Sequence, residues 1–460
     1  MTLAETAERP SAPTRDVYLD YAAATPLDPR VLSAMEPYLT SCFENPSAPY
    51  ARARVARDAV ERARADIARL MGAKPDGITF TAGATEANNL AFAATEGGVV
   101  TDAAEHESVL ACARAREAAV VGVGADGRVD PDRLCAAIGP ATQLVSVELA
   151  NGEVGAVQPV REIARGVALV RERRLAEGSR VPLWLHTDAS QAAGSLSCNV
   201  TSLGADLVTL SAAKVYGPKQ VGILWAGEGV RLRPLILGGG QEGGVRSGTE
   251  NVAGAVGFAA ALTLAQDCRG EECRREEALR SRLVRVLAAA FPGMVVSGPR
   301  SPKHRLPGLL HVSFPGLEAR RLVVLLERRG VSVGTGSACA ASRMRESHVL
   351  RAMGLPPEVS AGSLRITMGR PTSADDIDYA AAQIVAAVRA EMARTGLTDE
   401  DNLGFTYHAV NEYVRRGVCD PAIRAQIDQK HRVSRFKFQT LPVYHNGLPM
   451  ALTDETDYYK

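Results

Sequence analysis

Residues 206–219 read Asp206-Leu207-Val208-Thr209-Leu210-Ser211-Ala212-Ala213-Lys214-Val215-Tyr216-Gly217-Pro218-Lys219. A short apolar run ends in small residues, a single lysine and a Gly-Pro turn, which predicts a buried strand followed by a tight loop. The amine of Lys214 then lies at the carboxyl end of that strand. Desolvation there lowers the pKa of a lysine and frees the amine to attack a carbonyl, so Lys214 is a candidate for a Schiff base with a carbonyl cofactor. A solvated lysine beside a turn is the alternative.

The overall composition is that of a soluble globular protein. The chain has 460 residues, of which 46% are hydrophobic and 23% charged, and this length suits two or more domains. The formal net charge is +1, so we predict no basic face and no general nucleic-acid binding. No apolar stretch is long enough to cross a bilayer, and we predict no membrane association.

Eight cysteines are scattered along the chain, and none of their spacings is typical of zinc ligands. We therefore predict no metal site, and a reducing cytoplasm is the simplest setting for the protein. Residues 1–15 are polar and rich in Pro and Ala, and they lack the basic, apolar and cleavage regions of a signal peptide. We predict that they form a disordered leader.

Short β-rich runs alternate with helical patterns through the first 270 residues. The expected strands are Ile78–Phe80, Val99–Val100, Gln143–Leu149, Leu183–Leu185 and Leu207–Leu210. The expected helices are Pro49–Met71, Glu86–Ala94, Glu107–Ala118, Pro159–Ala176 and Val252–Gln266. This alternation predicts an α/β fold in which residues 16–270 form a large domain, with a mostly parallel sheet covered by helices on both faces.

The character of the sequence changes after about residue 270. Helices are expected at Arg275–Ala290, Leu317–Arg329 and Ala374–Arg394, and strands at Leu309–Phe314 and Val331–Val333. We interpret residues 271–397 as a smaller α+β domain. Residues 398–460, which hold many of the tyrosines and a basic cluster, form a separate tail.

Four residues with reactive or hydrogen-bonding side chains lie just past expected strands, namely Thr85, His106, Asp188 and Lys214. Ligands of parallel sheets bind at the carboxyl ends of the strands, so we predict that these residues share one site. Thr85 belongs to Thr81-Ala82-Gly83-Ala84-Thr85-Glu86, whose small residues and helix start suit one phosphate group. An ordinary turn with Thr85 as the N-cap is the alternative.

Asp188 ends a buried strand, where a carboxylate needs a partner. A protonated pyridine nitrogen would be such a partner, and the pairing would make the ring a better electron sink. Gln191, one turn further, could reach a ring oxygen. For Asp188 the alternative is an N-cap role. His106 could stack on an aromatic cofactor and move protons, although a lone histidine is more often structural.

Two loops and a strand complete the candidate set. Residues 238–251 are dense in glycine around Arg246, and such a loop offers N–H groups, a cation and a hydroxyl to an anion. In Gly334–Ser342 a single thiol, Cys339, stands among small residues, which favours an exposed nucleophile. Arg365 lies on a strand-like segment and could grip a carboxylate with two hydrogen bonds. A surface ion pair is the alternative for either arginine.

Together these segments resemble the cysteine desulfurases of the aminotransferase class V family, in the branch with a long catalytic-cysteine loop. Tyr18-Leu19-Asp20-Tyr21-Ala22-Ala23-Ala24-Thr25-Pro26 is similar to the opening motif of that family, and the resemblance runs in order from about residue 17 to about residue 393. It implies the fold of pyridoxal-phosphate-dependent transferases of fold type I, a homodimer, pyridoxal 5′-phosphate as the cofactor, and conversion of L-cysteine to L-alanine.

The resemblance also implies a role for each motif residue. Lys214 would hold the cofactor covalently and move the Cα proton of the substrate. Cys339 would take the sulfur as a persulfide and supply it to an acceptor protein. Arg365 would hold the substrate carboxylate, and Asn151 would contact substrate and cofactor.

The other implied contacts surround the cofactor. Asp188 would pair with the pyridine nitrogen, Gln191 would reach the ring hydroxyl, and His106 would stack on the ring. The phosphate would be bound by Ala84, Thr85 and Ser211, and by Thr249 from the second subunit. Three positions depart from the family pattern. Ala213 and Gly152 stand where the family often has His and Asn, and residues 45–50 lack a histidine often found after Asn-Pro.

The tail has a resemblance of its own. Leu403–Tyr413 and His431–Pro442 are similar to the C-terminal piece of ammonia-dependent NAD synthetases. The nucleotide loop of those enzymes is absent, so we assign no such activity. We hypothesise that the tail docks on a sulfur-accepting enzyme of the ATP-pyrophosphatase type; a solvated basic extension is the alternative.

Three other functions fit parts of the pattern. A selenocysteine lyase or a class V aminotransferase would need Lys214 but not Cys339. A non-catalytic scaffold is suggested by the departures and by the tail, and such a protein would not take up the coloured cofactor.

Overall fold

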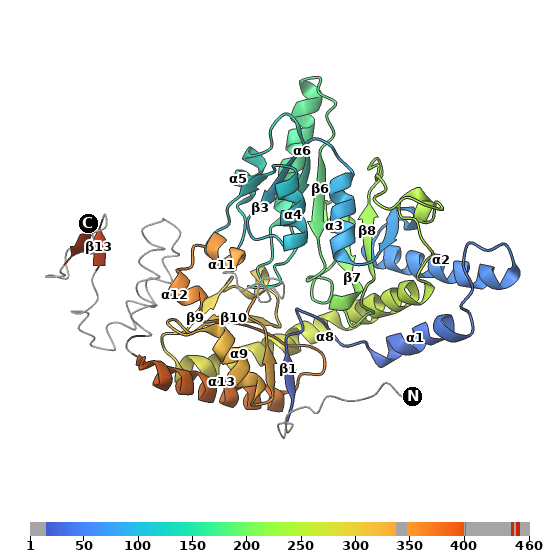
Figure 1. The fold of residues 1–460 in the computed structure, drawn as a ribbon. Helices are drawn as coiled ribbons and strands as arrows, with labels where there is room; N and C mark the ends of the chain where they lie inside the picture. Colours follow the sequence, from blue (N-terminus) through green and yellow to red (C-terminus); the bar gives the residue numbers. More distant parts are fainter. Residues whose placement is uncertain (1–14, 337–346, 400, 402–442, 446–447, 451–460) are drawn as a thin grey trace.

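The structure is a computed structural model that describes residues 15–336, 347–399, 401, 443–445 and 448–450. It consists of a larger α/β unit and a smaller α+β unit joined by one long helix (Figure 1). The first 14 residues of the predicted leader, the segment with Cys339 and most of the predicted tail lie outside the described residues. Arg15, the last residue assigned to the leader, forms an ion pair with Asp376.

A seven-stranded sheet forms the centre of the larger unit, in the order β2-β8-β7-β6-β5-β3-β4. Its strands are β2 (Ile78–Thr81), β3 (Gly98–Asp102), β4 (Ala119–Val121), β5 (Thr142–Ser146), β6 (Trp184–Asp188), β7 (Leu207–Ser211) and β8 (Gly222–Ala226). Neighbouring strands are parallel except at β8, which is antiparallel to both β7 and β2. The prediction of a mostly parallel sheet is confirmed.

Helices cover both faces of this sheet. One face packs on α3 (Ala84–Ala93) and α4 (Glu107–Ala115). The other packs on α2 (Ala51–Met71), α5 (Pro131–Ala136), α6 (Val160–Ala176), α7 (Val200–Leu203) and α8 (Val252–Ala290), and α1 (Pro29–Thr40) lies along α8. Because side chains alternate along a strand, Leu144 faces the first set of helices and Val145 the second. Burial on both faces explains the continuous apolar runs in the strands.

The smaller unit is built on an antiparallel sheet in the order β12-β10-β9. Its strands are β9 (Val295–Ser297), β10 (Leu309–Ser313) and β12 (Ser363–Thr367), and beside them β1 (Val17–Leu19) pairs in parallel with β11 (Val331–Val333). The helices are α9 (Ala319–Glu327), α11 (His348–Ala352), α12 (Pro357–Ser360) and α13 (Ala374–Thr395). The first strand of the chain therefore belongs to the smaller unit, not to the large domain as predicted.

The helix α8 changes the predicted domain boundary. We predict two helices, Val252–Gln266 and Arg275–Ala290, with a boundary after residue 270, but the structure has one helix of 39 residues. The intervening segment contains Gly270 but no proline, and a single glycine costs a helix only about 1 kcal/mol. The first half of α8 packs on the large sheet and the second half on the smaller core, so both units share it.

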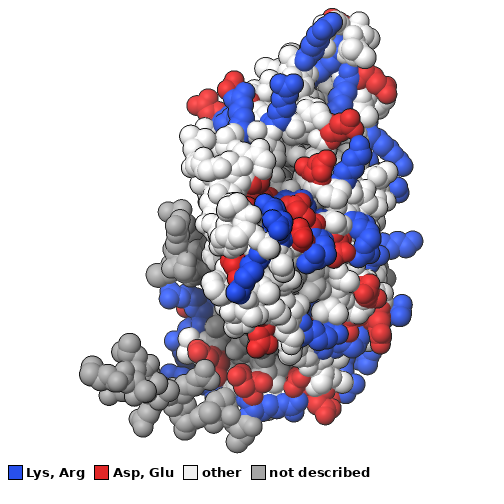
Figure 2. Space-filling view, turned by 90° about the vertical axis from the view of Figure 1, so that its right-hand side faces the viewer, with Lys and Arg blue, Asp and Glu red and all other residues white. Residues whose placement is uncertain are grey.

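The remaining features concern the tail and the surface. In the tail, β13 (Val443–His445) and β14 (Leu448–Met450) form an antiparallel pair. Within the described ranges, no helix is both long and apolar enough to cross a membrane. Figure 2 shows basic and acidic side chains interspersed over the face that it draws, as 53 basic and 52 acidic residues lead us to expect.

Candidate active site

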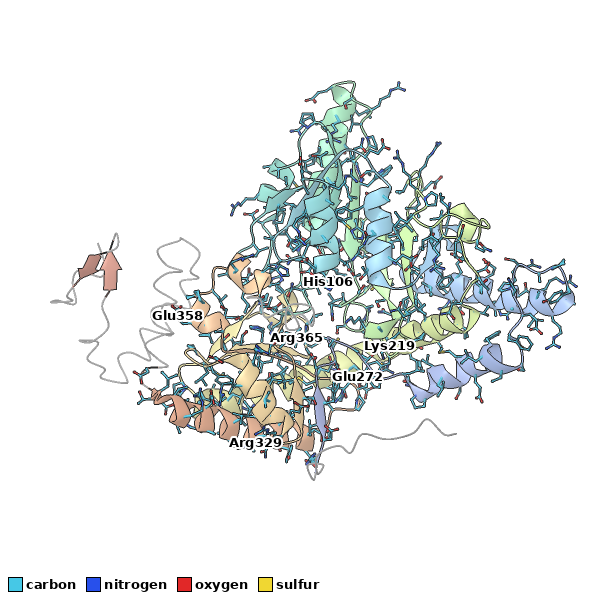
Figure 3. All side chains as sticks on the ribbon, viewed as in Figure 1. His106, Lys219, Glu272, Arg329, Glu358 and Arg365 are labelled. Carbon is cyan, nitrogen blue, oxygen red and sulfur yellow. The ribbon has the colours of Figure 1, made fainter. Side chains whose placement is uncertain are left out.

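The candidate residues gather where the carboxyl ends of the parallel strands meet the smaller unit. Asp188 ends β6, Lys214 follows β7, and His106 follows β3. Arg365, on β12, approaches from the smaller unit, and Figure 3 shows His106 and Arg365 at the junction of the two units. The sheet edge thus brings together residues that are far apart in the sequence.

Lys214 is the last residue of the short 3-10 helix η2 (Ala212–Lys214), which begins where β7 ends. Its Nζ donates hydrogen bonds to the carbonyl oxygens of Ala22 and Ala23, over 2.7 and 2.8 Å. Burial, and to a lesser extent the charge of Arg365, lowers the pKa of the amine to about 8. A larger fraction of this amine is therefore unprotonated near neutral pH than of an exposed lysine, as a nucleophile requires.

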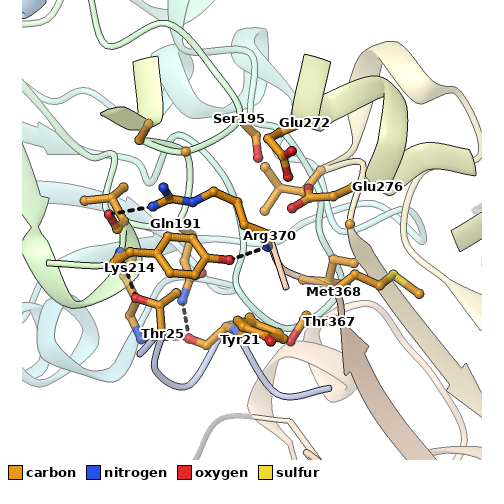
Figure 4. A pocket seen from close by; sticks show the side chains of 18 of the residues that line it. Tyr21, Thr25, Gln191, Ser195, Lys214, Glu272, Glu276, Thr367, Met368 and Arg370 are labelled. Atoms are coloured by element: carbon orange, nitrogen blue, oxygen red, sulfur yellow. Dashed lines mark hydrogen bonds between the residues drawn. The ribbon is translucent and has the colours of Figure 1, made fainter. Parts of the chain in front are cut away.

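The opening motif of the chain holds the loop that carries Lys214. Thr25 Oγ1 donates to the carbonyl oxygen of Ala213 over 3.0 Å and accepts the N–H of Tyr216 over 2.8 Å. Tyr216 has a φ of +65°, an uncommon conformation for a bulky residue, and the guanidinium of Arg370 lies 3.7 Å from its ring centroid. Thr25, Tyr216 and Arg370 line a cavity of about 100 Å³ beside Lys214, and Figure 4 shows Thr25 and Arg370 around it.

A chain of hydrogen bonds connects Asp188 with His106. Asn88, which is fully buried on α3, donates one amide hydrogen to Asp188 Oδ2 and the other to Ser108 Oγ, both over 2.8 Å. Ser108 Oγ lies 2.8 Å from His106 Nδ1. The second carboxylate oxygen of Asp188 accepts the N–H of Ser190 over 2.9 Å. The buried carboxylate therefore accepts hydrogen bonds from two donors and keeps lone pairs for a third.

His106 is the N-cap residue of α4, and its protonation follows from that position. The N–H of Ser108 donates to His106 Nδ1 over 3.1 Å, so the proton of the neutral ring is on Nε2. Although the side chain is partly exposed, desolvation by the surrounding protein lowers the pKa of the imidazole, and the charge of Asp188 opposes that change. The ring is therefore neutral near pH 7 and presents one N–H donor.

The start of α3 is shaped for an anion. Gly83, its N-cap residue, has a φ of +128° and provides no side-chain cap. Ala84 and Thr85 begin the helix, where free N–H groups and the helix dipole favour a phosphate group. A Cβ on Gly222 would lie 2.7 Å from the backbone of Gly83, so this position on β8 must be glycine. Ser211, at the end of β7, is buried nearby in the sheet.

A buried ion pair fixes the glycine-rich loop 238–251. Arg64, on α2, donates from both terminal nitrogens to the carboxylate of Glu242, over 2.8 Å each. Glu242 also accepts the N–H of Phe80 over 2.9 Å. The two charged side chains are only 10% and 5% exposed, which makes removal of one partner costly. Thr249 lies further along this loop and is exposed in the single chain.

Arg365 is a buried residue, not a surface ion-pair partner. Its side chain is 5% exposed. Nη2 donates to Asp20 Oδ1 over 2.8 Å, and Nη1 donates to the carbonyl oxygen of Gly152 over 3.0 Å. The guanidinium is therefore already bound to a carboxylate, the class of group that we predict it holds in the substrate.

The comparisons with known proteins agree with this geometry. The family model of aminotransferase class V matches residues 17–380. The chain is 40% identical over 377 residues to the cysteine desulfurase IscS of Dictyoglomus turgidum, which covers 79% of this chain and 92% of that protein. The chain belongs to the cysteine desulfurases of the aminotransferase class V family.

Two solved structures extend the comparison to the fold. A NifS-like protein superposes with a TM-score of 0.74 at 32% identity, covering 82% of this chain and 100% of that chain. SspA, solved in complex with cysteine, superposes with a TM-score of 0.63 at 31% identity, covering 76% of this chain and 98% of the other. The predicted fold type I is confirmed.

Desulfurases of this family use pyridoxal 5′-phosphate, and the described residues fit it. Lys214 supplies an amine of lowered pKa, the uncapped start of α3 suits the phosphate, and Asp188 has free lone pairs for a ring N–H. When bound, the pyridine ring serves as a sink for the electrons left on the substrate Cα. His106, which follows β3 at the same sheet edge, would be the candidate to stack on the ring.

The departure from the family at Gly152 has a steric reason. A Cβ at position 152 would lie 2.8 Å from Nε2 and 2.9 Å from Cγ of Gln191. Gln191 Nε2 donates to the carbonyl oxygen of Ala22 over 3.0 Å. The side chain of Gln191 therefore lies where the side chain of a second asparagine would begin.

The side chain of Asn151 is fully hydrogen-bonded within the protein. Its amide donates to the carbonyl oxygen of Ala104 over 2.9 Å and to Glu148 Oε1 over 2.7 Å. Its carbonyl oxygen accepts the N–H groups of Glu153 and Val154. Both amide hydrogens are thus used within the protein, and Asn151 shapes the turn that presents the Gly152 carbonyl to Arg365.

Three carboxyl groups lie buried behind the site, and sequence analysis did not single them out. Burial raises the pKa of Asp102 to about 7. It also raises the pKa values of Glu105 and Glu148 well above their ordinary range, and repulsion from Asp102 adds to both shifts. Asp102 Oδ2 and Glu105 Oε1 have no hydrogen-bond partner among the described residues. Protonated carboxyl groups at these positions avoid a concentration of buried negative charge.

Cys339 lies outside the described residues, but both ends of its segment are described. A Cβ on Gly336 would lie 3.0 Å from Glu153 Oε1, and Ser347 Oγ donates to the same carboxylate oxygen. Gly334 exchanges two backbone hydrogen bonds with Arg365. The segment that carries Cys339 therefore begins and ends beside the candidate substrate site.

Sequence analysis missed the residues that act through others, chiefly Asn88, Ser108 and Glu242. Asn88 lies in the second turn of α3 and Ser108 in the first turn of α4, on faces that are otherwise apolar. A polar residue on a buried helix face is the only signal for them in the sequence. It indicates a hydrogen bond but not its partner.

Proposed function

We propose that the protein converts L-cysteine to L-alanine and holds the sulfur as a persulfide on Cys339. The observation that carries the proposal is the joint placement of Lys214 and Arg365. An amine of lowered pKa and a buried guanidinium lie close enough for one charge to shift the pKa of the other. An amino-acid substrate needs both, one near its Cα and one for its carboxylate. The cysteine desulfurase relatives and the SspA complex favour L-cysteine as that amino acid.

Each of three residues carries out one step of the proposed reaction. Arg365 exchanges the carboxylate of Asp20 for that of the substrate and so orients the amino acid. Lys214 Nζ removes the proton from the substrate Cα. The thiolate of Cys339 attacks the substrate sulfur, the bond between sulfur and Cβ breaks, and its electron pair stays on carbon. Protonation of that carbon completes the methyl group, and return of the proton from Lys214 Nζ to Cα gives L-alanine.

Chain length supports the role of Cys339. Three residues of extended chain span at most about 11 Å, and Cys339 is three residues after Gly336. Gly336 lies at Glu153, and Gly334 is bonded to Arg365. A thiol on this tether has access to a substrate whose carboxylate is held by Arg365.

The test compares L-alanine and sulfide formation by the wild-type protein and Cys339→Ala, with and without a thiol reductant. We expect Cys339→Ala to lose more than about 100-fold in kcat while it keeps the absorbance of the bound cofactor; Cys42→Ala, a change outside the site, should keep full activity. Full desulfuration by Cys339→Ala would favour the selenocysteine lyase or aminotransferase alternatives. A protein that stays colourless with added cofactor would favour the scaffold alternative.

We also infer that the protein is a homodimer in which Thr249 reaches the phosphate site of the partner. The support is an apolar surface beside the glycine-rich loop, where Leu235, Ile236 and Leu237 are 48%, 41% and 81% exposed. Exposed apolar groups in sequence mark an interaction surface. The buried pair of Arg64 and Glu242 holds the loop in position to be presented to a second chain.

Mixing two defective variants tests the shared site. Random exchange of Lys214→Ala and Thr249→Ala subunits makes about half of the dimers hybrid, and one of the two sites in each hybrid carries neither change. The mixture should therefore regain about a quarter of wild-type activity. Activity equal to the mean of the separate variants would show that each site lies within one subunit.

The destination of the sulfur is the least constrained part of the proposal. The protein is proposed to act in the cytoplasm and to pass sulfur to an acceptor protein, with residues 398–460 docking on an enzyme of the ATP-pyrophosphatase type. The family match ends at residue 380, which leaves the tail free for a separate role. Recovery of such an acceptor from extract by the full chain, but not by a chain ending at residue 397, is the expected result. Equal recovery would end the docking proposal.

A further inference from the structure

A row of three polar residues crosses the sheet of the smaller unit. Ser297 on β9 lies opposite His311 on β10, which lies opposite Arg365 on β12. Residues in register on neighbouring strands point to the same face. Their neighbours Leu310, Val312, Leu364 and Ile366 point to the other face, into the small hydrophobic core. The row therefore faces the larger unit and the candidate active site.

The backbone pattern brings the side chains of His311 and Arg365 close together. The N–H and C=O of Arg365 both bond to Gly334, on the side away from β10. Arg365 and His311 therefore form a non-hydrogen-bonded pair of the antiparallel ladder. In such pairs the Cα atoms are only about 4.5 Å apart and the side chains are at their closest.

The row is buried but incompletely bonded. Ser297, His311 and Arg365 are 8%, 1% and 4% exposed. Among the described residues there is no hydrogen-bond partner for Ser297 Oγ, for either ring nitrogen of His311, or for Nε of Arg365. Buried polar atoms without partners reduce stability, and in native proteins they call for an explanation in function.

The present position of Arg365 explains why its Nε is free. The guanidinium is held by Asp20 and by the Gly152 carbonyl through its two terminal nitrogens. A Cβ on Gly334 would lie 3.2 Å from Arg365 Nε and 2.8 Å from Asp20 Oδ1. The side chain of Arg365 therefore lies on the side of Asp20. A substrate carboxylate competes with Asp20 for the same nitrogens, and the guanidinium must turn to meet it.

We propose that His311 is a positioning residue for Arg365. When the guanidinium of Arg365 turns from Asp20 to the substrate carboxylate, its Nε–H donates to a ring nitrogen of His311. This hydrogen bond fixes the plane of the guanidinium. This inference rests on the proposed function, in which Arg365 holds that carboxylate.

The state of the imidazole suits this role. Burial, and then the charge of Arg365, lowers the pKa of His311 to about 3. The ring is therefore neutral at physiological pH and always offers one acceptor nitrogen. A protonated ring would instead repel the guanidinium.

The test uses His311→Leu, which removes the acceptor, and His311→Asn, whose amide oxygen can replace it. Ser313→Ala is the matched control, because Ser313 is on the same strand and face, is buried and lacks a partner, but lies opposite Ser363. The measurements are KM and kcat for L-cysteine and the dissociation constants of L-alanine and ethylamine, read from the absorbance of the bound cofactor. Ethylamine has the amine but no carboxylate.

We expect His311→Leu to raise KM and the L-alanine dissociation constant about tenfold, with kcat and ethylamine binding nearly unchanged. His311→Asn and Ser313→Ala should stay within about twofold of the wild type. The melting temperature of His311→Leu should not fall, because the variant loses two unpaired buried nitrogens. Equal weakening of L-alanine and ethylamine, or no weakening of either, would overturn the proposal.

A double-mutant cycle separates this inference from the proposed function. In a chain that already carries Arg365→Leu, the additional change His311→Leu should have no further effect on L-alanine binding. If Arg365→Leu alone leaves L-alanine binding intact, the proposed role of Arg365 fails. If Arg365→Leu weakens binding and His311→Leu does not, only the role of His311 fails.

Discussion

Lys214 and Gln191 donate hydrogen bonds to the same carbonyl oxygen, that of Ala22, over 2.7 and 3.0 Å. Two side chains that are implied to meet one cofactor are thus held by the opening motif of the chain. Ala23 accepts a second hydrogen bond from the lysine. The opening motif begins in β1, which belongs to the smaller unit. It therefore sets the position of the Lys214 amine in the larger unit.

The lowered pKa of Lys214 predicts the pH dependence of cofactor uptake. Only the unprotonated amine attacks the aldehyde, and its pKa is lowered to about 8. The rate of holoprotein formation should therefore rise with pH to a plateau with a midpoint near pH 8. Absorbance at a series of pH values measures this rate. Lys214→Ala should form no holoprotein, and Lys74→Ala, a change at an exposed position, should leave the pH dependence unchanged. A midpoint above pH 10 would contradict the lowered pKa of Lys214.

Asn88 should matter far more than its neighbour Asn89. Asn88→Ala removes a hydrogen bond to the carboxylate of Asp188 and interrupts the connection to His106. A hydrogen bond to a charged group contributes about 1.5–3 kcal/mol, so kcat should fall by about 10- to 100-fold. Asn89 is exposed, and its side-chain amide donates to the Thr85 carbonyl oxygen of the same helix. The steady-state kinetics of Asn88→Ala and Asn89→Ala test this prediction. Equal losses of kcat would show that the hydrogen bonds of Asn88 to Asp188 and Ser108 are not needed for activity.

Gly152 and Gln191 should behave as a coupled pair. Gly152→Ala places a Cβ within 2.8–2.9 Å of the Gln191 side chain, and such overpacking costs about 1–3 kcal/mol of unfolding free energy. Gln191→Ala should relieve much of that loss when both changes are combined. Urea unfolding of the two single variants and the double variant measures the coupling. Strictly additive losses would show that the two side chains do not compete for this space.

Asp102 should make the protein less stable as the pH rises. Burial raises its pKa from an ordinary value of 3.8 to about 7 in the folded state. The stability that its protonated form contributes is therefore complete below about pH 4 and lost as the pH rises through 7. Asp102→Asn should remove part of the fall in unfolding free energy between pH 5 and pH 8. Asp76→Asn, at an exposed position, is the control and should leave the pH profile unchanged.

Sequence patterns located the elements of the site better than its internal contacts. The strand ends that carry Asp188 and Lys214 could be predicted because apolar runs and the turns after them are local signals. The contact between Asp20 and Arg365 joins residues 345 positions apart, and no periodicity connects them. The single helix α8 also escaped prediction, because its polar middle section resembles a linker until packing on two cores holds it together.

The amino-acid sequence by itself predicted the fold class, the candidate lysine after β7 and the candidate aspartate at the end of β6, because each depends on residue type and on neighbours in the chain. Only the tertiary structure decided how these groups are tuned. The pKa of Lys214, the hydrogen bond from Asn88 to Asp188 and the free ring nitrogens of His311 depend on burial and on partners from distant segments. Electrostatics and hydrogen bonding act through space, so they are settled only when the chain has folded.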